Sequence, residues 1–183
     1  MNNNISFTAK FISPATVKKL TPNGKYVDIE VSAVKLASKN KDDLSALEKI
    51  NKEWGADTYA SNILDEASST NEFYKDYRPT VYAITTQRDN FEKLEPEKVL
   101  GLAETSIEFG IIKSLDYLQT NPKFLNKVQP TIKHIGTAML KFIENINKGH
   151  RIAIDSVKEA KAFYMKNGYK RLNEYTNIFF KDV

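Results

Sequence analysis

The residues from Lys133 to Ala138 combine a positive charge with small residues, directly before an amphipathic helix. Apolar residues recur at positions 135, 138, 139, 142, 143 and 146, the spacing of one helix face. A helix N-terminus presents free N–H groups and the positive end of the helix dipole, which together favour a bound phosphate. Gly136 allows the backbone to approach such a ligand closely. This segment therefore predicts a phosphate-binding turn.

A second segment runs from Ala160 to Tyr169, with Tyr164 and Gly168 at its fifth and ninth positions. A short apolar strand is predicted between the two segments, over 151–155. Together they resemble the GNAT family of N-acetyltransferases, whose patterns are [QR]-x-x-G-x-[GA] and, about 25 residues later, A-x-x-x-Y-x-x-x-G-[FY]. Lys133 stands where the first pattern has Gln or Arg, so the charge is kept and the bidentate fork of Arg is lost.

The resemblance implies an acetyl-CoA site between two splayed parallel strands, 114–120 and 151–155. Backbone groups of the first strand would bind the pantetheine arm as an added strand would. The following turn would hold the pyrophosphate. The implied cofactor-binding residues are Leu118, Gln119, Thr120, Lys133, His134, Ile135, Gly136, Thr137, Ala138 and Ser156, and no metal is expected.

The same resemblance implies transfer of an acetyl group to a primary amine by direct attack, without a covalent enzyme intermediate. Tyr164 would donate a proton to the leaving sulfur, since a thiol has a pKa of ~8.5 and tyrosine one of ~10. Packing of its ring on the apolar side of its helix is the alternative. Glu104, in the middle of a predicted strand, would accept a proton from the amine, unless it faces solvent. Asp116 is a weaker choice for this base.

Two departures from the family leave alternatives open. Val157 stands where the family often has an asparagine that contacts the cofactor, and Ser156 can replace it or cap the next helix. Both Pro122 and Pro130 resemble the proline that follows the cofactor strand, and we favour Pro122. The resemblance implies an acceptor pocket near a group of aromatic and acidic residues, although a packed helix pair with a solvated outer face is the favoured explanation of the same residues. They are Trp54, Asp57, Tyr59, Glu72, Phe73, Tyr74 and Asp76.

The elements that position these residues follow from periodicity and turn signals. We expect strands over 27–33, 80–87, 99–109, 114–120, 151–155, 169–172 and 177–181, and helices over 41–54, 57–68 and 136–146. A Ser-x-x-Glu capping box at Ser156 predicts the start of a fourth helix. This order matches the GNAT fold, an α/β fold with a mixed, mostly antiparallel sheet and about four helices. The domain would span 25–183, after an N-terminal extension of residues 1–24 that adds a strand or hairpin.

Composition narrows the function class. The chain has 183 residues, 41% of them hydrophobic, a net charge of +4 and no cysteine, which excludes thiolate catalysis and disulfides. Basic residues are spread along the chain, so a nucleic-acid partner is not expected. No apolar run approaches the ~20 residues of a membrane span, and we expect a cytoplasmic protein. A homodimer through Ile178–Phe180 is one possibility, and a non-catalytic acyl-CoA-binding or sensing module is the alternative function.

Overall fold

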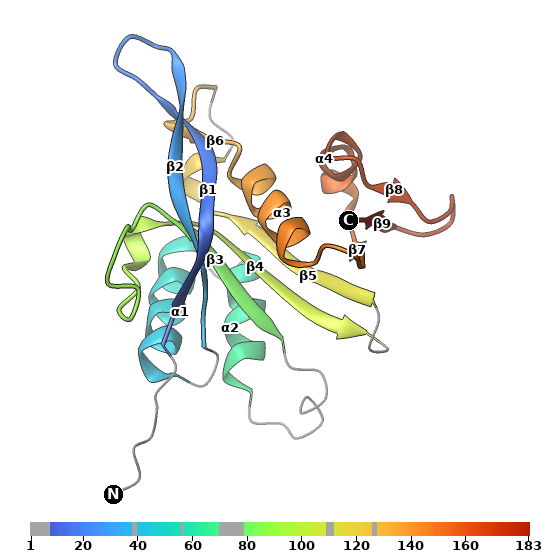
Figure 1. Ribbon diagram of the computed structural model, residues 1–183, viewed down its shortest axis with the longest axis horizontal. Helices are drawn as coiled ribbons and strands as arrows, with labels where there is room; N and C mark the ends of the chain where they lie inside the picture. The colour runs from blue at the N-terminus through green and yellow to red at the C-terminus, as the bar shows by residue number, and fades with distance from the viewer. Residues whose placement is uncertain (1–7, 38–39, 56, 70–78, 109–111, 126–127) are drawn as a thin grey trace, which may run out of the picture.

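The computed structural model describes residues 8–37, 40–55, 57–69, 79–108, 112–125 and 128–183. They form a mixed α/β structure with one nine-stranded sheet in the order β6-β1-β2-β3-β4-β5-β7-β9-β8 (Figure 1). The strands are β1 (Lys10–Leu20), β2 (Tyr26–Lys35), β3 (Thr80–Thr85), β4 (Val99–Glu108), β5 (Ile112–Thr120), β6 (Ile132–Lys133), β7 (Arg151–Asp155), β8 (Lys170–Arg171) and β9 (Ile178–Asp182). Only β5 and β7 pair in parallel among these strands.

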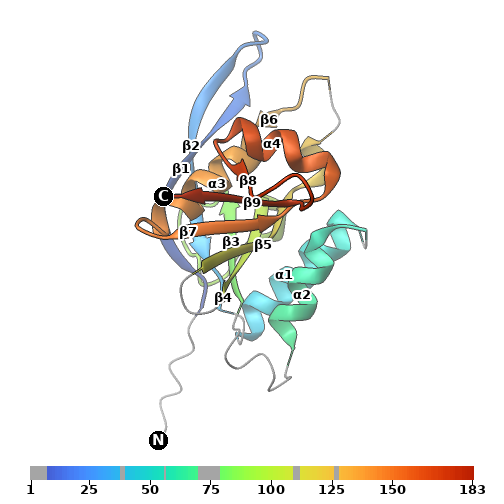
Figure 2. The same ribbon diagram turned by 90° about the vertical axis from the view of Figure 1, so that its right-hand side faces the viewer.

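Helices cover both faces of the sheet (Figures 1 and 2). The α-helices are α1 (Lys41–Trp54), α2 (Tyr59–Ser68), α3 (Ile135–Ile146) and α4 (Lys161–Lys166), with short 3₁₀ helices over Pro96–Lys98, Pro122–Phe124 and Lys158–Ala160. One core cluster joins α1 and α2 to β2, β3 and β4, and a second joins α3 and α4 to β1, β5, β7 and β9. The sheet therefore separates two apolar layers. No helix in the described ranges is long and apolar enough to cross a bilayer.

Local sequence explains the ends of α1, which match the prediction. The Asn40 side chain accepts hydrogen bonds from the backbone N–H groups of Asp42 and Asp43, as an N-cap does. Gly55 follows the helix with φ of 92°, a conformation that a residue with a side chain rarely adopts. The predicted number of α-helices is also confirmed along the described chain, and so is the predicted order of helices and strands apart from β6.

The sheet is larger than a typical GNAT sheet because strands are added at its edge. β1 forms a long antiparallel hairpin with β2, and two-residue β6 pairs with β1 through Lys18–Lys133 and Lys19–Ile132. The predicted extension thus lies in the same sheet as the rest of the chain, while its boundary at residue 24 stays a prediction. β6 was not predicted, since its two residues carry no periodic pattern.

The predicted capping box is wrong. The Ser156 hydroxyl donates to the carbonyl of Val157, and the backbone N–H of Ser156 donates to Asn177 next to β9. Ser156 therefore continues the extended backbone of β7. The 3₁₀ helix Lys158–Ala160 follows, and α4 begins only at Lys161.

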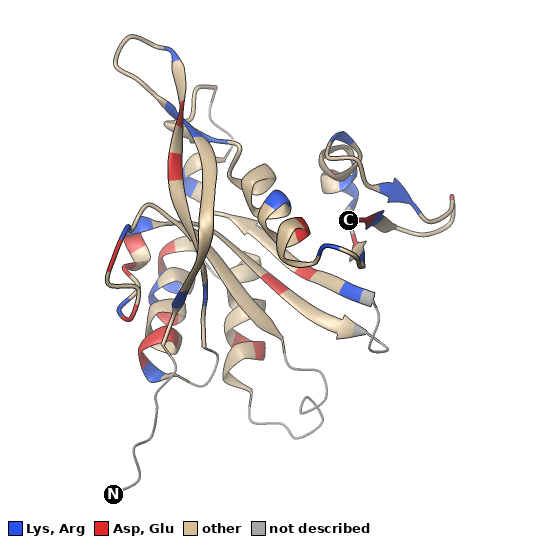
Figure 3. Cartoon of the chain, viewed as in Figure 1, with Lys and Arg blue, Asp and Glu red and all other residues tan. Residues whose placement is uncertain are grey.

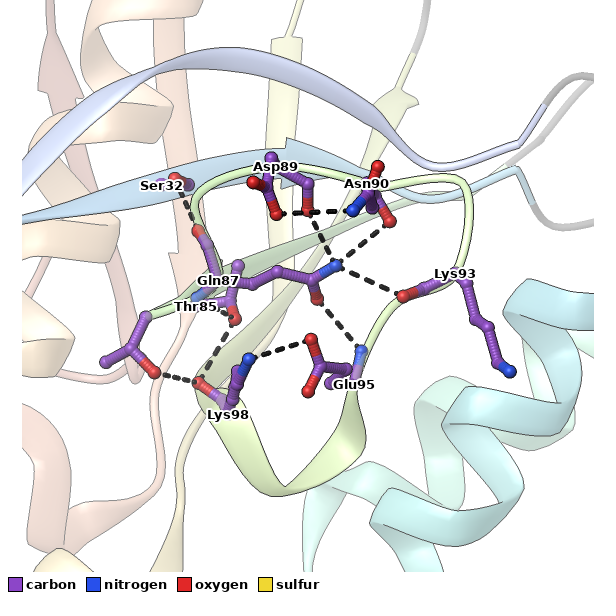
Figure 4. A network of polar contacts seen from close by, with 9 residues as sticks. Ser32, Thr85, Gln87, Asp89, Asn90, Lys93, Glu95 and Lys98 are labelled. Carbon is purple, nitrogen blue, oxygen red and sulfur yellow. Dashed lines mark hydrogen bonds and ion pairs between the residues drawn. The ribbon is translucent and has the colours of Figure 1, made fainter.

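The connection between β3 and β4 is organised by the side chain of Gln87 (Figure 4). Its Nε2 donates to the carbonyls of Asp89, Asn90 and Lys93, and its Oε1 accepts the backbone N–H of Glu95. Gln87 is 2% exposed, so these contacts satisfy polar groups that water does not reach. One buried amide thus fixes a connection that carries no regular ladder of its own.

Candidate functional site

The parallel strands β5 and β7 separate after three paired positions. The paired residues are Ile112, Lys113 and Ser114 of β5 with residues 151–153 of β7. No further pair joins the two strands beyond Ser114. The remaining six residues of β5 rise about 3.3 Å each, so roughly 20 Å of its edge faces away from β7. The predicted splay of these two strands is present in the structure.

A cleft of about 570 Å³ lies at this separation. It extends from the end of β5 to the N-terminus of α3 and to α4. Its lining residues are Leu118, Gln119, Thr120, Phe124, Leu125, Ile132, Lys133, His134, Ile135, Gly136, Thr137, Phe163, Lys166 and Asn167. The structure thus brings together every predicted cofactor-binding residue except Ala138 and Ser156. Ala138 is a buried residue of α3 and lines a neighbouring groove against β1, while Ser156 is buried directly after β7.

The turn before α3 has the geometry of an anion site. His134 is the N-cap residue and adopts a left-handed conformation, with φ of 67° and ψ of 20°. Its carbonyl accepts the N–H of Ala138, which closes the first turn. The N–H groups of Ile135, Gly136 and Thr137 precede that bond and have no partner within the helix. These donors, on residues that line the cleft, can bind a phosphate.

Positive charge surrounds this turn. Burial is the largest cause of a lowered pKa at His134, and Lys133, Lys18 and Lys166 lower it further. The Nζ of Lys133 lies 3.5 Å from the centre of the Tyr26 ring, a cation–π contact that holds it beside the cleft. The mouth of the cleft at α3 is therefore cationic.

Close packing at Gly136 explains why the turn needs a glycine. A Cβ atom there would lie 3.1 Å from the Phe163 ring and 3.7 Å from Leu118. Both side chains line the cleft. Phe163 and Lys166 were not predicted as site residues, because an aromatic residue in the core and a lysine at the surface are ordinary on a short helix. Their positions within the second motif were the signal that could have identified them.

Tyr164 lies at the base of this region and is 7% exposed. Its ring packs edge-on against Phe163 and Tyr169, at centroid distances of 5.2 and 5.9 Å. Burial, with a smaller contribution from Tyr59, raises the pKa of Tyr164 to about 12. The phenol is therefore protonated at neutral pH, as a proton donor must be. Its ring packs in the core, which is the alternative role, and proton donation by its hydroxyl stays a prediction.

Glu104 is completely buried, and its carboxyl lies beside that of Glu66. It pairs across the sheet with Tyr117 of β5 and Val81 of β3, on the face covered by α1 and α2. Burial raises the pKa of Glu104 to about 10, and a side-chain hydrogen bond with Glu66 and the charges of Glu66 and Asp116 add to the rise. The solvent-facing alternative is thus wrong. Its carboxyl is protonated at neutral pH while no cation is bound beside it.

Glu66 was not among the residues selected from the sequence. This residue lies on α2, and its Oε1 accepts the Tyr117 hydroxyl at 3.1 Å. Tyr59, also on α2, packs against Tyr117 with the two rings tilted and their centroids 5.4 Å apart, and its backbone N–H donates to the Gln119 side chain. Its helical spacing with buried residues made Glu66 look like an ordinary polar helix residue. The pairing of β4 with β5 brings Glu104 opposite Tyr117, and the hydrogen bond from Tyr117 brings Glu66 to the same place.

An irregularity in the β4–β5 ladder lies at the same place. The register shifts between Glu104 and Thr105, whose partners are Tyr117 and Leu115, so Asp116 is the additional residue.

Of the predicted acceptor residues, Trp54 is buried in the core and Tyr59 contacts Tyr117. Asp57 is exposed, and residues 72, 73, 74 and 76 lie outside the described ranges.

Comparisons with known proteins add little to this geometry. No family model matches the chain, and a search of curated proteins finds no match. Among solved structures, the chain is similar to a protein of Deinococcus radiodurans R1 that is provisionally described as an acetyltransferase. The identity is 12%, the TM-score 0.47, and the match covers 78% of this chain and 84% of the other. Similarity at this level carries no argument about activity, so function has to be argued from the site.

Proposed function

We propose that the chain is an acetyl-CoA-dependent N-acetyltransferase of the GNAT type, acting on a primary amine. The observation that carries the proposal is the cleft between β5, α3 and α4, where an unpaired strand edge leads to a helix N-terminus surrounded by lysines. An extended chain of amides ending in phosphates is complementary to such a surface. The amides match the strand edge, and the phosphates match the helix and its positive charge.

The chain's own residues divide the work. Backbone groups of Leu118, Gln119 and Thr120 bind the amide arm as a partner strand would. The N–H groups of Ile135 to Thr137 hold the pyrophosphate, with Lys133 and Lys166 adding charge. Acetyl-CoA supplies an acyl carbon activated as a thioester.

Two proton movements complete the transfer. The neutral amine attacks the acyl carbon, the carbon–sulfur bond breaks, and the amine nitrogen loses a proton. Tyr164 donates its phenolic proton to the departing sulfur and is reprotonated from solvent. Such a general acid contributes about 10²–10⁴-fold to the rate. Glu104 carries a proton in the empty protein and can receive the amine proton only after it has ionised, and Glu66 is the second carboxyl group beside it.

Calorimetric titration tests the cofactor site directly. We expect micromolar binding of acetyl-CoA and of desulfo-CoA, and at least tenfold weaker binding of ATP, which lacks the pantetheine arm. Absence of CoA binding, or equal binding of ATP, would overturn the proposal. Release of free thiol from acetyl-CoA in the presence of an amine panel then tests turnover.

A non-catalytic acyl-CoA-binding module is the second candidate. It is favoured by one observation: Tyr164 is nearly buried and is absent from the residues that line the cleft. Tight acetyl-CoA binding without thiol release across the amine panel would support this module. Turnover that depends on the Tyr164 hydroxyl would exclude it.

A further inference from the structure

The short helix α4 carries residues with which the C-terminal part of the chain reaches the cleft. Phe163 and Lys166 line the cleft, as does Asn167 directly after the helix, and Tyr164 is the only buried residue of α4. A helix of six residues is marginal without contacts to other elements. Among the described residues, no side chain caps its N-terminus at Ala160. The position of α4 therefore depends on what holds its C-terminal end.

A glycine turn closes the backbone at that end. Gly168 follows the helix with φ of 87°, and the N–H of Tyr169 donates to the carbonyl of Tyr164 at 3.1 Å. The next carbonyl in need of a partner is that of Asn167, and the Nζ of Lys181 on β9 donates to it at 3.1 Å. A cation there also interacts favourably with the negative end of the helix dipole. Lys181 thus holds the end of α4.

The same lysine is bound to α3. Its Nζ lies 2.9 Å from Oε1 of Glu144, in the last turn of α3, and the two side chains are 28% and 17% exposed. Each of the other ion pairs in the described chain is more exposed, so water screens this pair least. Figure 3 shows both signs of charge on α3 and on the C-terminal elements beside it. One ammonium group therefore joins the last turn of α3 to the end of α4.

Lys181 occupies an inward-facing position of its strand. It pairs with Ile152 of β7 and shares its face of β9 with Phe179, and neither apolar residue has any exposed surface. Burial of an ammonium group costs free energy, so a lysine is rarely found at such a position without partners. The contacts to α3 and α4 offset this cost. Packing alone does not explain a charge here.

The network reaches Tyr164 through one ring. Tyr169 directly follows the glycine turn, is 3% exposed and packs edge-on against Tyr164 at a centroid distance of 5.9 Å. The Nζ of Lys181 lies 5.5 Å from the centre of the Tyr169 ring. Burial is the largest cause of a raised pKa at Tyr169, and Glu144 adds to it, so Glu144 lies beside this residue as well. The ion pair and Tyr164 thus lie against the same side chain.

We propose that Lys181, paired with Glu144, is a positioning residue that fixes α4 against α3 and so places the Tyr164 hydroxyl for proton donation. This inference rests on the proposed transferase function and adds two residues that do not line the cleft. The chemical step is unchanged: the carbon–sulfur bond and the phenolic O–H bond break, and an S–H bond forms. A displacement of about 1 Å can lower a rate about 10²-fold, so a contact remote from the reacting atoms affects the rate.

Hydrogen exchange tests the position of α4 without any substrate. Lys181→Met keeps the length of the side chain and removes the ammonium group. We expect the amide of Tyr169 to exchange at least tenfold faster in this variant, while the amide of Ala138 at the start of α3 stays within twofold. Lys141→Met, on the exposed surface of α3, is the matched control and should change neither amide. Unchanged exchange at Tyr169, or equal acceleration at both amides, would overturn the proposal.

Kinetics separate a positioning role from a purely structural one. Lys181→Met should lower kcat for thiol release at least tenfold and leave acetyl-CoA affinity within threefold, because the groups on β5 and α3 that bind the cofactor keep their places. Lys181→Arg keeps a cation with donors for both acceptors, and its kcat should stay within threefold of the parent. Equal losses of kcat in the Met and Arg variants, or a loss of affinity alone, would contradict the positioning role.

A double-mutant cycle tests the link to Tyr164. In a Tyr164→Phe background, Lys181→Met should lower kcat less than twofold, because the hydroxyl that it places is already gone. Glu144→Gln should lower kcat as Lys181→Met does, and the two changes together should cost little more than either alone. A full tenfold loss in the Tyr164→Phe background would show that Lys181 does not act through this hydroxyl.

The same samples distinguish the two proposals. Absence of acetyl-CoA binding in the parent protein refutes the transferase. Acetyl-CoA binding without turnover supports the non-catalytic module and refutes the positioning role with it. Turnover that Lys181→Met leaves within twofold of the parent refutes the positioning role alone.

Discussion

The two sides of strand β5 differ in charge, burial and openness. On one side, a wide cleft carries lysines and the N-terminus of α3. On the other side, acidic groups and two tyrosines surround a carboxyl that has no exposed surface. Successive residues of one strand reach both sides, since Leu118 lies against Gly136 near α3, while Tyr117 bonds to Glu66 on α2.

The two sides make different demands on the core. The N-terminus of α3 presents backbone N–H groups, which need no charged side chain in the core. The acidic side places carboxyl groups there, and burial raises the pKa of Glu104. Glu104 is therefore protonated at neutral pH, whereas the backbone N–H groups at α3 do not titrate in this range.

The largest change in reaction rate is expected at Tyr164, which packs against Phe163 and Tyr169. Tyr164→Phe removes one hydroxyl and keeps the ring packing against Phe163 and Tyr169. We expect the rate of thiol release to fall about 10²–10⁴-fold with acetyl-CoA affinity unchanged. Steady-state kinetics together with calorimetry measure both. A rate within threefold of the parent would remove Tyr164 from the chemistry.

The anion side is broken next at its closest contact. A Cβ atom at Gly136 would lie only 3.1 Å from the Phe163 ring. Gly136→Leu adds this atom and three further carbon atoms. The ring has to shift, so acetyl-CoA affinity should fall about 100-fold. Gly24→Ala, in the distant β1–β2 turn, serves as a glycine control for acetyl-CoA binding. Equal losses of affinity in the two variants would contradict the role of the Gly136 contact.

The acidic side is tested through stability. Below its usual pKa of 4.5, Glu104 is protonated in both the folded and the unfolded chain. As the pH rises from 4.5 towards 10, the unfolded chain releases this proton and the folded chain retains it, so folding stability falls. Glu104→Gln should remove that loss and raise the free energy of unfolding by about 2 kcal/mol at pH 7.5.

Urea denaturation at pH 5 and pH 7.5 measures this effect. The stabilisation by Glu104→Gln should be smaller at pH 5 than at pH 7.5. Asp65→Asn, with an exposed carboxylate, should show no such dependence. A gain that is independent of pH would mean that Glu104 is not the titrating group.

The smallest expected effect sharpens the cationic side. Replacement of both Lys133 and Lys166 by Gln should weaken acetyl-CoA binding about tenfold at low salt and less at high salt, because screening already reduces their contribution. Lys133 should contribute less than Lys166, since its Nζ is held over the Tyr26 ring. Salt titrations of the single variants measure the order. Lys49→Gln on α1 is the control and should leave affinity unchanged.

Periodic elements were predictable from the sequence. The range 41–54 for α1 and 151–155 for β7 agree with the structure, because each has a clear apolar pattern and a nearby end signal. The turn before α3 and its neighbours on β5 were also placed correctly in one cleft. Short-range patterns were sufficient wherever neighbouring residues determine the structure.

Features that depend on distant contacts were not predictable. Ser156 has the local sequence of a helix cap, but Asn177 holds its backbone in the extended form. Glu66 became part of the site only through the hydrogen bond to Tyr117, 51 residues away. Charge and burial at such positions follow from strand register, which one sequence without its fold does not reveal.

The pairing of β6 with β1 joins two segments that are synthesised at different times. Lys18 leaves the ribosome before its partner Lys133, which follows only after more than a hundred further residues have been synthesised. The Tyr26 hydroxyl likewise waits for the carbonyl of Pro130. Closing so long a loop is slow relative to local helix formation. The turn before α3 should therefore be among the last parts of the molecule to fold. In a chain without β1, we expect α3 to form at its normal rate, but the turn at the entrance to the cleft would lack its pairing partner.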